Sequence, residues 1–273
     1  MDFDISSIQN AGIKEISALL AKPKMRRESG NFVIEGVREF ERALETGIEI
    51  ISVYFAPEII GKEGIENILN RHHIPTPPSL HSVPLRLYAK IAYRESTEGI
   101  VAVAKIPLKD IDNIKLSENP LIIVLEAAEK PGNIGAILRT ADAAGADAVI
   151  LCDPQADLYN PNVIRASTGG VFVENVIVLQ SEELYKWLKA KNILIYTAQL
   201  QDSVLYYECD MTKGCAIVMG SEAQGLTQYW RDRADKKIRI PMHGRVDSLN
   251  LSVSTAILCY EAVRQKLEGR SEK

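Results

Sequence analysis

The sequence predicts an α/β protein of two domains, the second of which is built on a parallel β-sheet flanked by helices. The chain has 273 residues, more than one domain usually holds. Apolar strand-like segments alternate with helical stretches throughout its second half. Between the halves lies PLKDIDNIKLSENP, a polar stretch that begins and ends with proline, as interdomain connections often do. We therefore expect a first domain at 1–106, a linker at 107–119 and a second domain at 120–273.

The first domain is predicted to be a small α/β sandwich. Residues 7–21 carry isoleucine and leucine at helical spacing, which indicates an amphipathic helix. NFVIEG (31–36) and IEIISVYFAP (48–57) are strand-like, and the helical segment VREFERALETG (37–47) separates them. A further alternation of helix and strand follows, so that helices cover a sheet.

Six strand-like segments predict the sheet of the second domain. They are LIIVLE (121–126), DAVILC (147–152), VFVENVIVL (171–179), ILIYTAQ (193–199), CAIVMG (215–220) and KKIRIPM (236–242). Continuous apolar runs separated by helices are typical of parallel strands that are buried on both faces. In such sheets ligands bind at the carboxyl ends of the strands.

The composition narrows the class of protein. Hydrophobic residues make up 46% of the chain, and no apolar run reaches the length of a membrane span. The N-terminus MDFDISSIQN is acidic and polar, unlike a signal peptide, so we expect a cytoplasmic protein without membrane contact. The four cysteines lack CxxC spacing and predict buried, reduced thiols. Adjacent His72 and His73 point to different faces of a helix end, so no metal site is expected.

The charge distribution limits where a nucleic acid could bind. The formal net charge is −4, and both halves carry slightly more acidic than basic side chains. Phosphate binders usually carry a basic excess, so an RNA surface here has to be a local patch. The candidates are Lys22, Lys24, Arg26 and Arg27 in AKPKMRRESG, together with Arg139 and Arg165.

Three blocks combine glycine-rich turns with polar residues where strands should end. The first is KPGNIGAILRTADAAG (130–145), in which Asn133 can cap a helix whose apolar positions face inward, leaving Arg139 on another face. There Arg139 is placed to meet a phosphate beside the free N–H groups of the helix. GNIGAI lacks the third glycine of GxGxxG, which argues against a dinucleotide-binding Rossmann domain.

The other two blocks are VMGSEAQGL (218–226) and IPMHGRVDSLNLSVS (240–254). Gly220 stands at a strand end, where a missing Cβ allows a ligand to approach the backbone closely, and Glu222 follows it. In the last block a strand ends at Ile240-Pro241-Met242. Ser248 is then expected to cap a helix that continues through Leu249 and Asn250 to residue 267.

The order and content of these blocks resemble the SpoU (TrmH-type) RNA ribose 2′-O-methyltransferases of the knotted SPOUT superfamily, over residues 120–267. The resemblance implies S-adenosylmethionine as methyl donor, a trefoil knot, a homodimer and a ribosomal RNA substrate. It also implies that the backbone at Gly220, Ile240, Met242 and Leu249 holds the adenosine, and that the catalytic centre comprises Asn133, Arg139, Glu222, Ser248 and Asn250. In this family Arg139 would act either as general base or as a stabiliser of charge on phosphate and alkoxide.

RRESGNFVIEGVREFERAL (26–44) resembles the L30e-like substrate-binding domain that often precedes this catalytic domain. One departure from the family lies in the first block, where Lys130 replaces a common aspartate, so that the contribution of this acidic residue is either missing or taken over by Glu129 or Glu126. Two alternatives stay open. One is a tRNA-directed or antibiotic-resistance methyltransferase, and the other is a non-catalytic RNA-binding or ribosome-assembly protein, against which the intact site residues argue.

Overall fold

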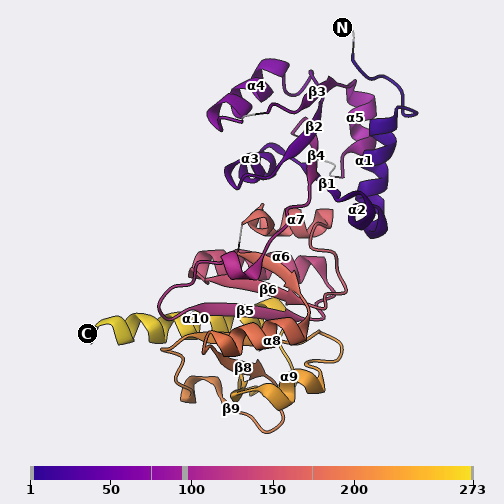
Figure 1. Cartoon of the computed structure of the whole chain (residues 1–273). Coiled ribbons are helices and arrows are strands. Elements are labelled where there is room, and N and C mark those ends of the chain that lie inside the picture. Colours follow the sequence, from indigo (N-terminus) through magenta and orange to yellow (C-terminus); the bar gives the residue numbers. More distant parts are fainter. Residues whose placement is uncertain (1–2, 75, 94–97, 174, 272–273) are drawn as a thin grey trace. The chain divides into compact units, whose positions relative to one another are not determined.

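The computed structural model describes residues 3–74, 76–93, 98–173 and 175–271 (Figure 1). Its internal contacts divide the chain into two compact units. Unit 1 consists of Met1–Leu108 and Asp157–Val173, and unit 2 consists of Lys109–Ala156 and Glu174–Lys273. In the described part of the chain no helix is long and apolar enough to cross a membrane.

Unit 1 is built on a four-stranded sheet of order β1-β4-β2-β3. The strand β4 is antiparallel to both β1 and β2, and β2 is parallel to β3. Helices α1 and α5 cover one face, while α3 and α4 lie on the other (Figure 1). The elements of this unit are α1 (Ala11–Ala21), α2 (Pro23–Ser29), β1 (Asn31–Glu35), α3 (Val37–Glu45), β2 (Ile50–Phe55), α4 (Lys62–Arg71), β3 (Ser79–Ser82), α5 (Leu85–Ile91), β4 (Ile100–Lys105), α7 (Pro161–Ser167) and the 3₁₀ turn η2 (Gly170–Phe172).

The segment 157–173 differs from the sequence-based prediction, because it lies inside the predicted second domain but packs in unit 1. Phe32 of β1 contacts the rings of Tyr159 and Phe172, with centroids 4.6 and 5.8 Å apart. Part of this segment was expected to begin a strand, yet residues 170–172 form η2 and the strand starts only at Val176. Apolar side chains of this segment therefore complete the core of unit 1.

Arg26 is buried in unit 1, which contradicts its predicted contact with RNA. Its side chain is only 1% exposed. The guanidinium donates hydrogen bonds to the Leu19 carbonyl oxygen and forms an ion pair with Asp157. The neighbouring Lys22 and Arg27 are exposed, as is Arg165 on α7. Burial removes Arg26 from any RNA-binding surface and gives it a structural role.

Unit 2 contains a seven-stranded sheet of order β7-β6-β5-β10-β8-β11-β9, and all its pairings are parallel. The predicted parallel sheet is confirmed, with one short strand, β9, in addition. The strands are β5 (Leu121–Glu126), β6 (Ala148–Cys152), β7 (Val176–Leu179), β8 (Leu194–Ala198), β9 (Val204–Leu205), β10 (Cys215–Met219) and β11 (Lys236–Arg239). The helices are α6 (Pro131–Ala144), α8 (Ser181–Ala190), α9 (Gln228–Arg233) and α10 (Leu251–Ser271), with 3₁₀ turns η1 (Ile111–Asn113) and η3 (Tyr206–Glu208).

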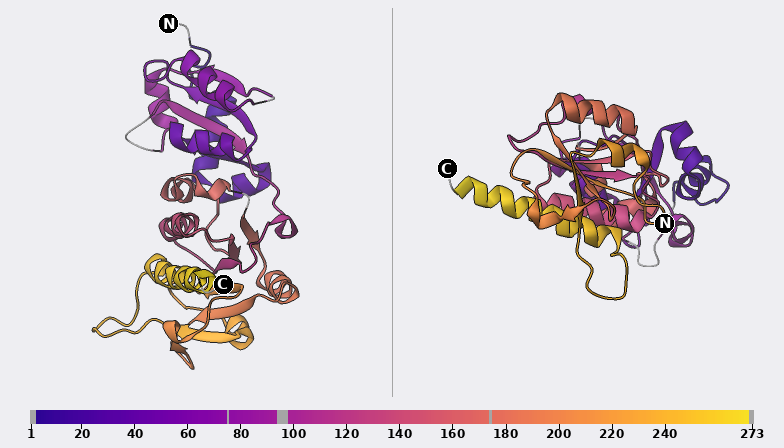
Figure 2. Two further views of the ribbon diagram at one scale, coloured as in Figure 1. Left: turned by 90° about the vertical axis from the view of Figure 1, so that its left-hand side faces the viewer. Right: turned by 90° about the horizontal axis from the view of Figure 1, so that it is seen from below.

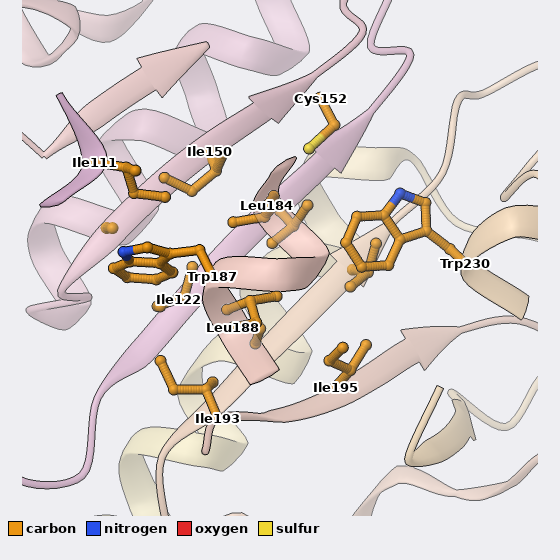
Figure 3. Close-up of a cluster of buried hydrophobic side chains, with 14 of the residues drawn as sticks. Ile111, Ile122, Ile150, Cys152, Leu184, Trp187, Leu188, Ile193, Ile195 and Trp230 are labelled. Carbon is orange, nitrogen blue, oxygen red and sulfur yellow. The ribbon is translucent and has the colours of Figure 1, made fainter. Parts of the chain in front are cut away.

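Helices cover both faces of this sheet. Figure 1 shows α8 and α9 on the near face, and the view from below in Figure 2 places α10 on the opposite side from α8. On the near face Leu184, Trp187 and Leu188 of α8 pack with Trp230 of α9 against the sheet residues (Figure 3). All four cysteines are free and buried, as expected. Burial raises the pKa of the Cys215 thiol to about 11, so it stays protonated at neutral pH.

From Lys109 on, the stretch predicted as a linker is a packed part of unit 2. Ile111 is 6% exposed and belongs to the same hydrophobic core, against which Ile114 and Leu116 also pack. Asp112 accepts a hydrogen bond of 3.0 Å from the Trp187 indole nitrogen. The polar composition was misleading because a few spaced apolar side chains are enough to pack this segment against the hydrophobic core of unit 2.

Replacing Arg26 tests its structural role. Arg26→Ala leaves Asp157 without its partner and the Leu19 carbonyl without a donor. We expect the free energy of unfolding to fall by about 3–5 kcal/mol, as when one member of a buried ion pair is removed. Urea titration followed by circular dichroism measures the change. Arg27→Ala is the matched control, since Arg27 is exposed one residue away. Equal unfolding midpoints for the two variants would contradict the assignment.

Candidate functional site

A cavity of about 530 Å³ lies in unit 2 at the carboxyl ends of the central strands. It is bounded by the residues after β8, β10 and β11 and by the start of α10. All four residues predicted to hold an adenosine line it, as do three of the predicted catalytic residues. These lining residues are Gly220, Ile240, Met242, Leu249, Glu222, Ser248 and Asn250. The second and third sequence blocks therefore meet at one cavity.

Gly220 was predicted to let a ligand approach the backbone closely. The structure shows a different reason for glycine at this position, which is the tight loop that follows it. The backbone of Ser221 and Gly225 forms two hydrogen bonds of 3.2 and 2.9 Å, which closes a tight loop after β10. Gly225 has a φ of 67°, a left-handed conformation that favours glycine. A Cβ placed on Gly220 would collide with the backbone of Gly225 and Leu226. The space that the missing Cβ leaves is thus filled by the protein itself.

A chain of polar side chains joins the three sequence blocks. The Asn133 amide nitrogen donates a hydrogen bond to Oε1 of Glu222. The Asn250 amide nitrogen in turn donates to the Asn133 amide oxygen, at 3.1 Å. Asn133 comes from the start of α6, Glu222 from the loop after β10 and Asn250 from the residue before α10. The structure therefore brings together three of the five predicted catalytic residues through direct hydrogen bonds.

Asn250, not Ser248, caps the C-terminal helix. The Asn250 side-chain oxygen accepts hydrogen bonds from the Ser252 backbone N–H and hydroxyl, at 2.9 and 2.6 Å. The helix α10 begins at Leu251, two residues later than a helix capped by Ser248 would. The exposed Ser248 hydroxyl donates to Asp247 at 3.3 Å. The amide oxygen and the amide nitrogen of Asn250 are thus both hydrogen-bonded, which fixes the orientation of its side chain.

The two carboxylate oxygens of Glu222 differ in their surroundings, because only Oε1 accepts a hydrogen bond from Asn133. Its Oε2 atom is buried and has no hydrogen-bond partner among the residues that the structure describes. A buried carboxylate oxygen without a partner is costly, and such an atom at a cavity points to a ligand that donates a hydrogen bond or carries positive charge.

Glu126, one of the two residues that could take over from the aspartate that Lys130 replaces, has both carboxylate oxygens hydrogen-bonded to Thr227. Its buried carboxylate accepts hydrogen bonds from the Thr227 backbone N–H at 2.8 Å and from the Thr227 hydroxyl at 2.6 Å. These bonds hold the residue that precedes α9. Lys130 itself lines the cavity with an exposed side chain.

Arg139 lies apart from the polar chain. Its side chain is exposed on α6, and within the described ranges no hydrogen bond or ion pair links it to Asn133, Glu222 or Asn250. Its catalytic role stays a prediction, as does the contact of Lys22, Arg27 and Arg165 with RNA.

Sequence reasoning missed several polar residues of the cavity, notably Arg231, Arg239 and Gln199. Arg239 donates to the Ser203 carbonyl oxygen, and Arg231 donates from Nε to the Leu226 carbonyl oxygen at 2.8 Å. The one signal in the sequence is that α9 directly follows the glycine loop, which places its first turns beside that loop.

Comparisons with known proteins agree with this geometry. The SpoU rRNA Methylase family model matches residues 120–260, and the MRM3-like substrate binding domain matches residues 10–102. A 23S rRNA (uridine(2479)-2′-O)-methyltransferase of Streptomyces viridochromogenes is 30% identical over 96% of this chain and 93% of its own. The Bacillus subtilis 23S rRNA (guanosine(2553)-2′-O)-methyltransferase RlmP is 29% identical over 94% and 97%.

Solved structures give the same result. An AdoMet-bound rRNA methyltransferase from Sinorhizobium meliloti has a TM-score of 0.86 and 29% identity, over 95% of this chain and 97% of its own. The SpoU methyltransferase AviRb from Streptomyces viridochromogenes in complex with AdoMet also has a TM-score of 0.86 and 29% identity, over 95% and 99%. The trefoil knot that the resemblance implies stays a prediction. With a family model that covers more than half of its residues, the chain belongs to the SpoU rRNA methylase family.

Proposed function

We propose that this chain transfers a methyl group from S-adenosylmethionine to a ribose 2′-hydroxyl of ribosomal RNA. The observation that carries the proposal is the hydrogen-bonded chain Glu222–Asn133–Asn250 beside a cavity lined by the four residues expected to hold adenosine. The names of the full-length relatives support the substrate. The intact polar chain argues against a non-catalytic RNA-binding role.

The cavity fits the methyl donor. Its volume of about 530 Å³ is in the range of small-molecule sites. Met242 and Leu249 supply apolar surface for an adenine ring, while the unpartnered Oε2 of Glu222 suits a cationic ligand. The donor, when bound, supplies a methyl group on a positively charged sulfur, which is already activated for nucleophilic attack.

The residues of the protein then have to position and orient the methyl donor and the RNA. Asn133 holds one oxygen of Glu222, which directs the other oxygen to the ligand. Asn250 holds Asn133 and is itself held by the first turn of α10, so that no member of the chain rotates freely. Such preorganisation lowers the entropic cost of aligning two reactants. Ser248 lies exposed at the cavity, where its hydroxyl is available to the RNA.

Arg139 is proposed to bind the RNA phosphate beside the target ribose and to stabilise the developing alkoxide. Its exposure on α6 leaves the guanidinium open to a macromolecular substrate. A guanidinium keeps its proton at neutral pH, which makes electrostatic stabilisation the better role than that of general base.

The proposed RNA contacts of unit 1 are Lys22, Arg27 and Arg165, all exposed. The match of residues 10–102 to a substrate binding domain supports the placement of Lys22 and Arg27, while Arg165 lies outside the matched residues. Because the net charge of the chain is −4, binding should depend on these local contacts and weaken as salt rises.

We also propose that the chain forms a homodimer through α10. Val253, Tyr260 and Leu267 recur at intervals of seven residues on this helix, and their exposed fractions are 47%, 50% and 56%. Residues at that spacing share one helix face. A second copy that packs on the same face would bury this apolar stripe, as in an isologous two-fold interface.

Substitution in the stripe tests the dimer. Tyr260→Asp places a charge at its centre and should convert a species of twice the chain mass into monomer in light scattering. Glu268→Gln, one residue beyond Leu267 and outside the stripe, should leave the mass unchanged. A wild-type protein that is monomeric at all concentrations, or a Tyr260→Asp variant that stays dimeric, would refute the interface.

Replacing Arg139 separates donor binding from methyl transfer. Arg139→Ala should lower turnover by about two to four orders of magnitude, the usual cost of removing one electrostatic stabiliser. Donor affinity should stay close to wild type because Arg139 does not line the cavity. Transfer of labelled methyl to ribosomal RNA measures the first quantity and calorimetry the second. Full turnover in this variant would disprove the role of Arg139.

Gly220→Ala tests the glycine loop. Since the added Cβ meets the backbone of Gly225 and Leu226, we expect both the melting temperature and donor affinity to fall. Gly244→Ala is the matched control, because Gly244 lies in the third block and a Cβ there meets nothing within 4 Å. Normal stability with lost binding in Gly220→Ala would show instead that the ligand, not the loop, requires this glycine.

A further inference from the structure

Arg231 is a fixed cation in the wall of the cavity. It comes from α9, and its half-buried side chain lines the cavity together with Gly225 and Leu226. The Nε atom donates to the Leu226 carbonyl oxygen at 2.8 Å. A Cβ built on Gly225 would lie 3.7 Å from Nη2, so this end of the guanidinium stands beside the glycine loop. One hydrogen bond thus holds the guanidinium in place.

The two terminal nitrogens of Arg231 are open. In the part of the chain that the structure describes, no carboxylate pairs with Arg231, and its only hydrogen bond from the side chain is that of Nε. The other arginines nearby are occupied differently. Arg239 donates to Ser203, while Arg233 lies over the Tyr229 ring at 3.9 Å and donates to the Tyr229 carbonyl oxygen.

A guanidinium with two parallel N–H donors matches a carboxylate or a phosphate in a bidentate geometry. Inside a partly enclosed cavity that bond is stronger than in water, because the local dielectric constant is lower. Fixing Nε beforehand also reduces the side-chain entropy lost on binding. The methyl donor carries one carboxylate, at the end of its amino-acid part.

We propose that Arg231 binds the carboxylate of S-adenosylmethionine, and this inference rests on the proposed function. Glu222, on the glycine loop, leaves its Oε2 for a cationic group of that ligand, so the loop and α9 present opposite charges to the cationic groups and the carboxylate of one molecule. The half-buried position of Arg231, in contrast to the exposed Arg139, favours this small anion over an RNA phosphate.

The test compares two ligands that differ in the carboxylate alone, S-adenosylmethionine and decarboxylated S-adenosylmethionine. Calorimetry measures their affinities for the wild type, for Arg231→Gln and for the control Arg233→Gln. Arg231→Gln should weaken the binding of S-adenosylmethionine about ten- to a hundredfold, the usual contribution of a charged hydrogen bond. It should change the affinity for the decarboxylated ligand by no more than about twofold. Arg233→Gln should bind both ligands like the wild type.

Three other results for the Arg231→Gln variant would overturn the inference. An equal loss for both ligands would make Arg231 a support for the glycine loop through its Nε bond. Unchanged affinity for both would leave Arg231 without a role in binding the donor. Weaker RNA binding with unchanged donor binding would assign the guanidinium to a phosphate. A wild type that binds neither ligand would instead refute the proposed function, so the two failures are distinguishable.

Discussion

The site depends on the position of β10 in the sheet of unit 2. This strand, late in the chain, pairs in parallel with β5 on one side and β8 on the other. The loop after β10 therefore lies beside the chain that leaves β5, and Glu222 meets Asn133 although 89 residues separate them. Glu126 reinforces the same edge by holding Thr227. Without that pairing, neither the polar chain nor the cavity would form.

Much of the fold could be predicted because buried parallel strands have an obvious pattern. LIIVLE and CAIVMG are continuous apolar runs, and both are central strands. The errors arose where long-range contacts decide the structure. The charge of Arg26 indicated a surface residue, but its partner Asp157 lies 131 residues away. The polar stretch before β5 indicated a linker, but Ile111 belongs to the core against α8.

The candidate site was predicted only in part, again because long-range contacts decide some of its residues. Motif content located Asn133, Glu222 and Asn250, which the structure joins. It did not distinguish Ser248 from Asn250 as helix cap, because both residue types cap helices well and the choice depends on the hydrogen bond to Asn133. Nor did it find Arg231, whose place at the cavity is set by a bond to a backbone carbonyl. Gly220 was identified from the sequence, but glycine is needed there because the loop closes over it and leaves no space for a Cβ.

The most direct test of the account is the position of the transferred methyl group. Ribosomal RNA incubated with the protein and labelled S-adenosylmethionine can be digested with alkali, which needs a free 2′-hydroxyl to cleave each phosphodiester bond. A methyl group on the ribose 2′-oxygen should keep the label in an alkali-resistant dinucleotide. Label released in mononucleotides, or no incorporated label with RNA that lacks the modification, would contradict it.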